Sequence, residues 1–127
     1  MGVDAALNGR SVLIVEDESM VAMLLQDTLE DIGYTVIGLA PRLNEALKKA
    51  ASLVFDIAIL DVNLNGSSSF PVAEVLKARG LPFIFATGYS GTSLPDFLQR
   101  VPIVQKPFQP QELEKAICTA LSQKAEG

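Results

Sequence analysis

Five polar side chains follow apolar stretches of the sequence, and together they could hold a metal ion and a phosphoryl group. They are Glu16, Asp17, Asp61, Thr87 and Lys106. Three carboxylates in one crevice repel one another and need a compensating cation, and oxygen-only ligands favour a hard ion such as Mg²⁺. Lys106 adds a positive charge and Thr87 a hydroxyl donor, both suited to phosphoryl oxygens. The set predicts a Mg²⁺-dependent site in which Asp61 accepts a phosphoryl group as an aspartyl phosphate.

The composition excludes several other kinds of chemistry. The sequence contains no histidine, so it has no Ser–His–Asp or Cys–His catalytic group, no zinc site with a histidine ligand and no phosphohistidine of its own. Its single cysteine excludes an internal disulfide and a site with several thiolates, which is typical of a reducing compartment. Ten basic and fifteen acidic residues give a net charge of −5, which argues against a general nucleic-acid binder.

The length of 127 residues is typical of one domain. We expect a lead-in over 1–10, the domain itself over 11–122 and a short polar tail over 123–127. The lead-in lacks the apolar run of a signal peptide, and no stretch approaches the roughly 18 consecutive apolar residues of a membrane span. These features predict a cytoplasmic protein that does not enter a membrane.

Apolar runs and helical patterns alternate along the chain. The predicted strands cover 12–15, 35–40, a stretch within 55–60 that Asp56 interrupts early, 83–86 and 101–104, and the predicted helices cover about 20–32, 43–51, 71–79, 96–100 and 110–124. Ser19 is the predicted N-cap of the first helix, and the polar stretch 63–69 is a predicted loop. Five strands alternating with five helices predict an α/β fold of the (βα)5 type with a doubly wound parallel sheet. Ligands bind outside the carboxyl ends of such strands, so the five polar side chains are expected to converge at one edge.

Each of these side chains also has a purely structural explanation. Acidic residues such as Glu16 and Asp17 often complement the dipole at a helix N-terminus, and Asp61 could simply begin a turn. Thr87 could belong to a turn and Lys106 to a solvated loop. Their shared position at strand ends favours a common site over these separate explanations.

Four motifs resemble those of the receiver domains of bacterial two-component response regulators, and the resemblance covers about 11–122. The motifs are Val-Leu-Ile-Val-Glu-Asp-Glu at 12–18, Ile-Leu-Asp-Val-Asn-Leu-Asn-Gly at 59–66, Ala-Thr-Gly-Tyr at 86–89 and Gln-Lys-Pro-Phe at 105–108. Any one of them is a weak signal, but together they are highly specific. The resemblance implies a flavodoxin-like sheet with the strand order 2-1-3-4-5.

The resemblance also implies which residues hold the metal ion. In such a domain Glu16 and Asp17 carry Mg²⁺ directly or through water, with Mn²⁺ as a substitute. Asp61 both ligates the metal and accepts the phosphoryl group, and the backbone carbonyl of Asn63 completes the protein ligands.

On the phosphoryl side, the resemblance implies that Thr87 and Lys106 contact the phosphoryl oxygens and that the bond between Lys106 and Pro107 is cis. The implied function is that of a single-domain response regulator, which accepts a phosphoryl group from a partner's phosphohistidine and signals through altered protein contacts. The donor is a sensor histidine kinase or a histidine phosphotransfer protein, and the downstream partner is another protein. Such a domain catalyses its own phosphorylation and dephosphorylation without being a conventional enzyme.

The sequence Phe-Ala-Thr-Gly-Tyr at 85–89 resembles a subgroup of mostly stand-alone receivers. Ile103 stands where receivers usually have an aromatic residue, three positions before the lysine. The conformational switch is therefore expected to use Thr87, Gly88 and Tyr89, with Tyr89 as the substitute aromatic.

Two alternatives stay open. The chain could be a receiver excised from a hybrid kinase or a DNA-binding regulator, although Met1 and the short tail 123–127 favour a complete chain. It could also be a phosphohydrolase with an aspartate nucleophile. That class places the nucleophile after the first strand, where 16–18 only mimic the pattern, and steady-state turnover of a small phosphoester would be its signature.

Overall fold

The chain folds into a parallel β-sheet between two layers of helices. The computed structural model describes residues 10–88 and 94–126. The strands of the sheet are β1 (Ser11–Val15), β2 (Thr35–Ala40), β3 (Ile57–Asp61), β6 (Phe83–Thr87) and β7 (Ile103–Gln105). They lie in the order β2-β1-β3-β6-β7, and every neighbouring pair is parallel. Counted along the chain, this confirms the order 2-1-3-4-5 of a doubly wound, flavodoxin-like sheet.

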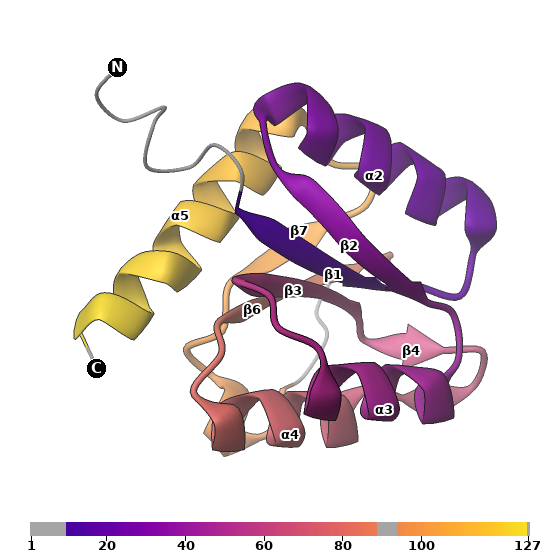
Figure 1. Ribbon diagram of the computed structural model, residues 1–127, viewed down its shortest axis with the longest axis vertical. Coiled ribbons are helices and arrows are strands. Elements are labelled where there is room, and N and C mark those ends of the chain that lie inside the picture. The colour runs from indigo at the N-terminus through magenta and orange to yellow at the C-terminus, as the bar shows by residue number, and fades with distance from the viewer. Residues whose placement is uncertain (1–9, 89–93, 127) are drawn as a thin grey trace.

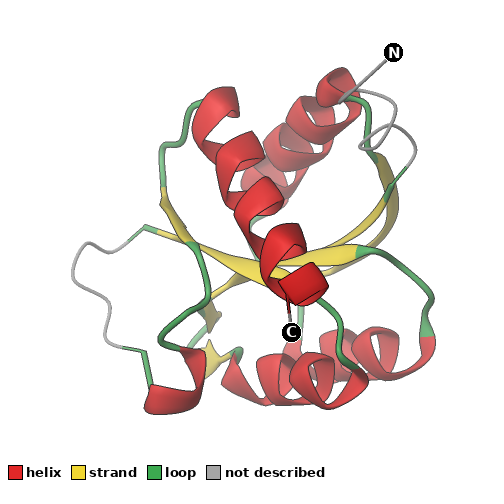
Figure 2. Ribbon diagram, turned by 90° about the vertical axis from the view of Figure 1, so that its left-hand side faces the viewer, coloured by secondary structure: helices red, strands yellow, loops and turns green. Residues whose placement is uncertain are grey.

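Four α-helices cover the two faces of the sheet in the described residues. They are α2 (Ser19–Ile32), α3 (Leu43–Ser52), α4 (Phe70–Arg79) and α5 (Pro110–Glu126). The pair α2 and α5 lies on one face, and the pair α3 and α4 lies on the other (Figures 1 and 2). Helices fill this role because two parallel strands cannot be joined by a tight turn and need a long crossover.

The predicted helix over 96–100 is wrong. In its place the chain forms a single 3₁₀ turn over Asp96–Leu98. Pro102 follows closely, and the residue before a proline is disfavoured in the helical region, which leaves little room for a regular helix. Leu98 is fully buried and anchors the turn against the core. The α/β sheet is thus confirmed, but the (βα)5 pattern is incomplete in the part of the chain that the structure describes.

The core has two halves, one on each face of the sheet. Leu13 and Val15 on β1 pack with residues of α3 and α4, whereas Val12 and Ile14 pack with residues of α2 and α5. All four side chains are fully buried. Because successive side chains of a strand point to opposite faces, a strand covered on both faces reads as a continuous apolar run.

The first helix begins differently from the prediction. Glu18, not Ser19, is the N-cap of α2, and no side chain caps that end. The reason lies in the preceding turn, where Oε2 of Glu16 accepts the N–H of Glu18 at 3.1 Å. The carbonyl of Glu18 then accepts the N–H of Ala22 at 2.9 Å, so Ser19 is already inside the helix.

β3 begins at Ile57, within the predicted stretch and just after Asp56, because the side chain of Asp56 connects two strands instead. Its Oδ2 accepts hydrogen bonds from the N–H of Ser11 at 2.8 Å and from the hydroxyl of Ser11 at 3.3 Å. In return the N–H of Asp56 donates to Oγ of Ser11 at 3.1 Å. These bonds join the starts of β1 and β3. β7 likewise begins at Ile103, after Pro102, which has no N–H to donate.

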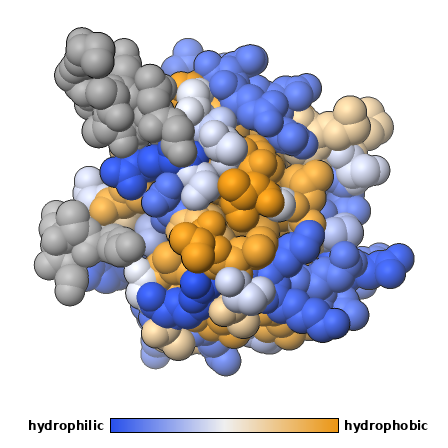
Figure 3. All heavy atoms as spheres, viewed as in Figure 1, coloured by the Kyte–Doolittle hydropathy of each residue, from blue (hydrophilic) through white to orange (hydrophobic). Residues whose placement is uncertain are grey.

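The edge of the sheet at β2 is partly apolar. Ile37 and Leu39 are each 38% exposed, and Figure 3 shows an apolar area between α2 and α3 on this side of the molecule. Nζ of Lys49 donates a hydrogen bond to the carbonyl of Leu39 at 2.7 Å, which occupies an edge acceptor that another strand could otherwise use.

Among the described residues, no helix combines the length and the hydropathy needed to cross a membrane.

The hydroxyl of Tyr34 is buried and has no hydrogen-bond partner among the described residues. Burial and, to a smaller extent, the charges of Cys118 and Glu114 together raise the pKa of Tyr34 to about 12. The folded protein therefore holds the phenol proton more tightly than the unfolded chain, in which the pKa is 10.0. Stability contributed by this difference is present below pH 10 and is lost as the pH rises toward 12.

We expect Tyr34→Phe to leave the free energy of unfolding at pH 7 unchanged or to raise it by up to about 1 kcal/mol, because the change removes an unsatisfied buried hydroxyl. Between pH 9 and pH 11 the wild-type protein should lose about 1 kcal/mol relative to this variant, since only the wild type has the phenol. Urea unfolding at the two pH values measures both effects. An unchanged difference between the two proteins would contradict the assignment.

Candidate functional site

The five side chains that the sequence singled out all lie at the carboxyl edge of the sheet. Glu16 and Asp17 follow β1, Asp61 and Thr87 end β3 and β6, and Lys106 follows β7. Carboxylate oxygens of Glu16, Asp17 and Asp61 lie within 4.8 Å of one another. The parallel strands bring these residues together because their carboxyl ends meet at one edge of the sheet.

Lys106 lies between two of the three acids. Its Nζ is 2.6 Å from Oε1 of Glu16 and 3.2 Å from Oδ2 of Asp61. The side chains of Glu16 and Asp61 are only 1% and 10% exposed, so water screens these pairs weakly. No ion pair among the described residues includes Asp17. Lys106 therefore offsets the charge of two acids and leaves the third without a cationic partner.

Burial and ion pairing have opposite effects on the pKa values of Glu16 and Lys106, and these values set the charge of the site. Burial raises the pKa of Glu16 to about 7, although the hydrogen bond from Lys106 lowers it. Burial lowers the pKa of Lys106, but the hydrogen bond to Glu16 and the charge of Asp61 outweigh that effect and raise the pKa above its ordinary value. Lys106 is thus firmly cationic. One lysine among three carboxyl groups leaves an acidic site, whose hard oxygen donors are of the kind that a divalent cation prefers.

A hairpin that the sequence analysis treated as a loop forms one wall of the site. It consists of β4 (Asn63–Leu64) and β5 (Ser67–Ser68). The N–H of Asn63 donates to Oδ1 of Asp61 at 3.3 Å, and the N–H of Asn65 donates to Oδ2 of Asp17 at 3.0 Å. Sequence reasoning missed the role of Asn65 and Gly66, although an Asn-Gly pair is the strongest local signal for a two-residue hairpin turn.

The predicted switch residues are only partly described. Thr87 is 2% exposed, and its carbonyl accepts the N–H of Lys106 at 2.8 Å, which joins the end of β6 to the loop after β7. The bond between Lys106 and Pro107 is cis, as the resemblance implies. Gly88 lines the site. Tyr89 lies outside the described residues, so its part in the switch stays a prediction.

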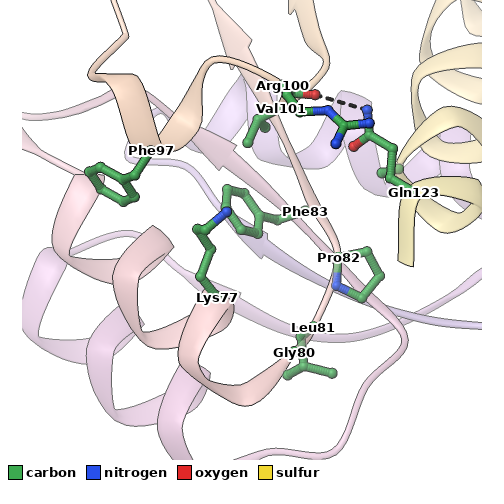
Figure 4. Close-up of a pocket in the computed structure, with 10 residues that line it drawn as sticks. Lys77, Gly80, Leu81, Pro82, Phe83, Phe97, Arg100, Val101 and Gln123 are labelled. Atoms are coloured by element: carbon green, nitrogen blue, oxygen red, sulfur yellow. Dashed lines mark hydrogen bonds between the residues drawn. The ribbon is translucent and has the colours of Figure 1, made fainter. Parts of the chain in front are cut away.

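A cavity of about 230 Å³ opens over the acidic cluster. It is lined by Asp17, Glu18, Asp61, Asn63, Asn65, Gly88 and Lys106. This volume is below that of typical pockets for organic ligands and suits an ion with a small anionic group. A larger groove of about 570 Å³ lies near the start of β6, between Lys77, Phe97 and Arg100 (Figure 4). That groove contains none of the predicted site residues.

A doubly wound parallel sheet with an acidic cluster and a lysine at its carboxyl edge is the arrangement that the resemblance to receiver domains implies. The family model of the response regulator receiver domain matches residues 12–118. The chain belongs to the response regulator receiver domain family.

Several known proteins are similar to this chain. The phyllosphere-induced regulator PhyR of Methylorubrum extorquens is 36% identical over 126 residues, which is 92% of this chain and 45% of PhyR. The solution structure of SdrG from Sphingomonas melonis Fr1 is 42% identical with a TM-score of 0.79, and the match covers 91% of this chain and 98% of SdrG. The BeF3-activated conformation of SdrG from Pseudomonas melonis Fr1 is 43% identical with a TM-score of 0.74, over 87% of this chain and 95% of that one. The chain spans about half the length of the curated relatives that it matches.

Proposed function

We propose that this domain accepts a phosphoryl group onto Asp61 from a phosphohistidine of a partner protein and signals through altered protein contacts. The observation that carries the proposal is the position of Asp61, whose carboxylate lines the 230 Å³ cavity with Lys106 3.2 Å away. A carboxylate becomes an effective nucleophile toward phosphorus when nearby cations offset the charge of the reaction. The family membership supports the proposal, as does the BeF3-activated conformation of SdrG, because BeF3⁻ resembles a phosphoryl group in shape and charge.

The donor set at this edge of the sheet fits Mg²⁺. Glu16, Asp17 and Asp61 offer hard carboxylate oxygens within one coordination sphere, and the backbone carbonyl of Asn63 is the proposed fourth protein ligand. Mn²⁺ would be accepted by the same oxygens. When bound, the ion would neutralise the acids and stabilise negative charge on the transferring group.

The transfer is an in-line displacement at phosphorus. An oxygen of Asp61 forms the new P–O bond while the P–N bond to the partner's imidazole breaks, and the electron pair of that bond leaves on the imidazole nitrogen. Lys106 offsets negative charge on the phosphoryl oxygens during this step. The hydroxyl of Thr87 then binds the new phosphoryl group, and the segment with Gly88 and Tyr89 carries the change to the surface.

The surface beside the site supports a protein as the phosphoryl donor. α2 begins two residues after Asp17, and its first turns expose Met20, Met23 and Leu24, of which Met20 is 83% exposed. Large apolar side chains grouped on an exposed helix are typical of a protein-binding surface. We propose that a sensor histidine kinase or a histidine phosphotransfer protein docks there, and that a further protein reads the phosphorylated form.

Whether the domain acts alone is a separate part of the proposal. Coverage of 98% of SdrG supports a stand-alone receiver, whereas coverage of only 45% of PhyR supports the alternative of a receiver within a longer regulator. Detection of the native protein by immunoblot in extracts of its source cells distinguishes the two. A stand-alone receiver has the 13.6 kDa mass of this chain, and a longer regulator has a larger one.

Removal of divalent cations is expected to slow phosphorylation of the domain by about 100-fold or more, which corresponds to several kcal/mol of lost charge stabilisation. The test incubates the chain with phosphoramidate, whose P–N bond resembles that of phosphohistidine, and follows the phosphoprotein by intact mass spectrometry. Phosphorylation should occur with Mg²⁺, stop in excess EDTA and return when Mg²⁺ is restored. Equal rates with and without EDTA would contradict a metal-dependent reaction.

A further inference from the structure

We propose that the β4–β5 hairpin is a positioning element for the metal site, in which the turn Asn65-Gly66 holds Asp17 in the orientation that a cation requires. The inference rests on the metal site of the proposed function and adds to it a control of cation affinity. The hairpin lies directly beyond the end of β3 (β4 in Figure 1), and Asn63 and Asn65 line the same cavity as Asp17 and Asp61. Asn63, Asn65 and Gly66 would act through Asp17.

Asp17 is the acid of the cluster that most needs such support. Lys106 holds Glu16 and Asp61 through ion pairs of 2.6 Å and 3.2 Å, but no ion pair in the described part of the chain reaches Asp17. Without a restraint, the like charges of the other two acids would drive this carboxylate toward solvent. The N–H of Asn65 supplies the restraint, because it donates to Oδ2 of Asp17 at 3.0 Å. Because this hydrogen bond occupies Oδ2, Oδ1 of Asp17 is the oxygen that would bind a cation.

The turn has the backbone conformation that this contact needs. Asn65 and Gly66 have φ angles of 52° and 92°, so both central residues of the two-residue turn lie in the left-handed region. Asparagine and glycine adopt this region more readily than other residues, which is why they are preferred in such turns. The preceding residue, Leu64, is 3% exposed and is part of the core, so the hairpin is anchored on the side away from the site.

The side chain of Asn63 closes the same turn. Its Oδ1 accepts the N–H of Gly66 at 2.8 Å, and its backbone pairs with Ser68 across the hairpin. Loss of this carboxamide would release the turn without touching Asp17 directly. Asn63 thereby has two separate roles, one through its side chain in the turn and one through its backbone near the metal site.

Mg²⁺ titration of the full chain by isothermal calorimetry tests the proposal. Asn63→Ala removes the carboxamide, and Gly66→Ala strains the positive φ while its new Cβ would meet no atom within 4 Å. Both changes should weaken Mg²⁺ binding by about tenfold, as expected for groups that orient a metal ligand. Gly80→Ala is the matched control, because it strains a positive φ of the same kind at the end of α4, outside the site, with no atom within 4 Å of the new Cβ, and its affinity should stay within about twofold of the wild type.

The midpoint of thermal unfolding in EDTA separates this effect from a general loss of stability. Backbone strain should lower the midpoint in EDTA by a similar amount in Gly66→Ala and Gly80→Ala, whereas Mg²⁺ should raise the midpoint less for Asn63→Ala and Gly66→Ala than for the wild type and Gly80→Ala. Wild-type affinity in Gly66→Ala and Asn63→Ala would overturn the proposal, as would a tenfold loss in Gly80→Ala. If the wild type itself binds no Mg²⁺, the metal site of the proposed function fails as well, which is a distinct result.

Discussion

Replacement of Asp61 by asparagine is expected to abolish transfer of a phosphoryl group to this domain. The change keeps the size of the side chain and the acceptor for the N–H of Asn63, but the amide is not a nucleophile and cannot form an acyl phosphate. Asp61 lines the cavity between Asp17 and Lys106, and the remaining acids lie beside it rather than in its place. No residual labelling at a neighbouring carboxylate is therefore expected.

The measurement uses a phosphorylated histidine kinase or phosphoramidate with Mg²⁺ and follows the phosphoprotein by intact mass. Asp31→Asn is the matched control, because Asp31 is an exposed acid near the end of α2, away from the sheet edge. The control should be phosphorylated at the wild-type rate, and its phosphoryl group should be released by hydroxylamine, as an acyl phosphate is. Unchanged labelling of Asp61→Asn would falsify the assignment of the acceptor.

Lys106→Gln is expected to lower the rate of phosphorylation by roughly 10²–10³-fold, the usual cost of removing one group that stabilises developing negative charge. The neutral amide can still donate a hydrogen bond, so the change tests the charge rather than the contact. In the wild-type structure, Nζ of Lys106 lies 2.6 Å from Oε1 of Glu16 and 3.2 Å from Oδ2 of Asp61. Because the positive charge of Lys106 lowers the pKa of Glu16, that pKa should rise further in the variant.

Single-turnover phosphorylation at saturating Mg²⁺ measures the effect, with Mg²⁺ affinity recorded in parallel. Lys115→Gln serves as the control, since Lys115 is exposed on α5 and is absent from the ion pairs of the described residues. The rate of Lys106→Gln should fall even when the metal site is fully occupied. A variant that regains the wild-type rate at high Mg²⁺ would show that Lys106 acts on metal binding and not on the transfer.

The sequence alone predicted the sheet and most of its helices, because local patterns of apolar residues indicate which positions are buried. A strand covered on both faces is apolar along its covered length, as β1 is from Val12 to Val15 and β6 from Phe83 to Ala86. The same patterns located Glu16, Asp61 and Thr87 at strand ends, since a polar side chain at the end of such a run marks the sheet edge. Local patterns were least informative over 96–100. There the helical pattern is weak and Pro102 lies close by, and the structure has a 3₁₀ turn over Asp96–Leu98 in place of a regular helix.

The hairpin β4–β5 was within reach of the sequence but was not predicted. Its Asn65-Gly66 pair is a strong local signal, yet strands of two residues are too short to show an alternating pattern. The sequence also gave no indication that the N–H of Asn65 would meet Asp17, because the two residues are separated by 48 positions. Contacts of that kind depend on how elements pack and not on any property of the segments themselves.

What the sequence determined by itself is the set of chemical groups and the edge of the sheet at which they gather. The tertiary structure decided how those groups share their charge. It placed Lys106 between Glu16 and Asp61, which lie 90 and 45 positions away along the chain. Asp17 instead accepts a hydrogen bond from the backbone N–H of Asn65. Ion pairing falls off steeply with distance and depends on burial, so a difference of a few ångströms in packing selects which acid is neutralised. The order of residues along the chain therefore does not show which of the three acids pairs with Lys106.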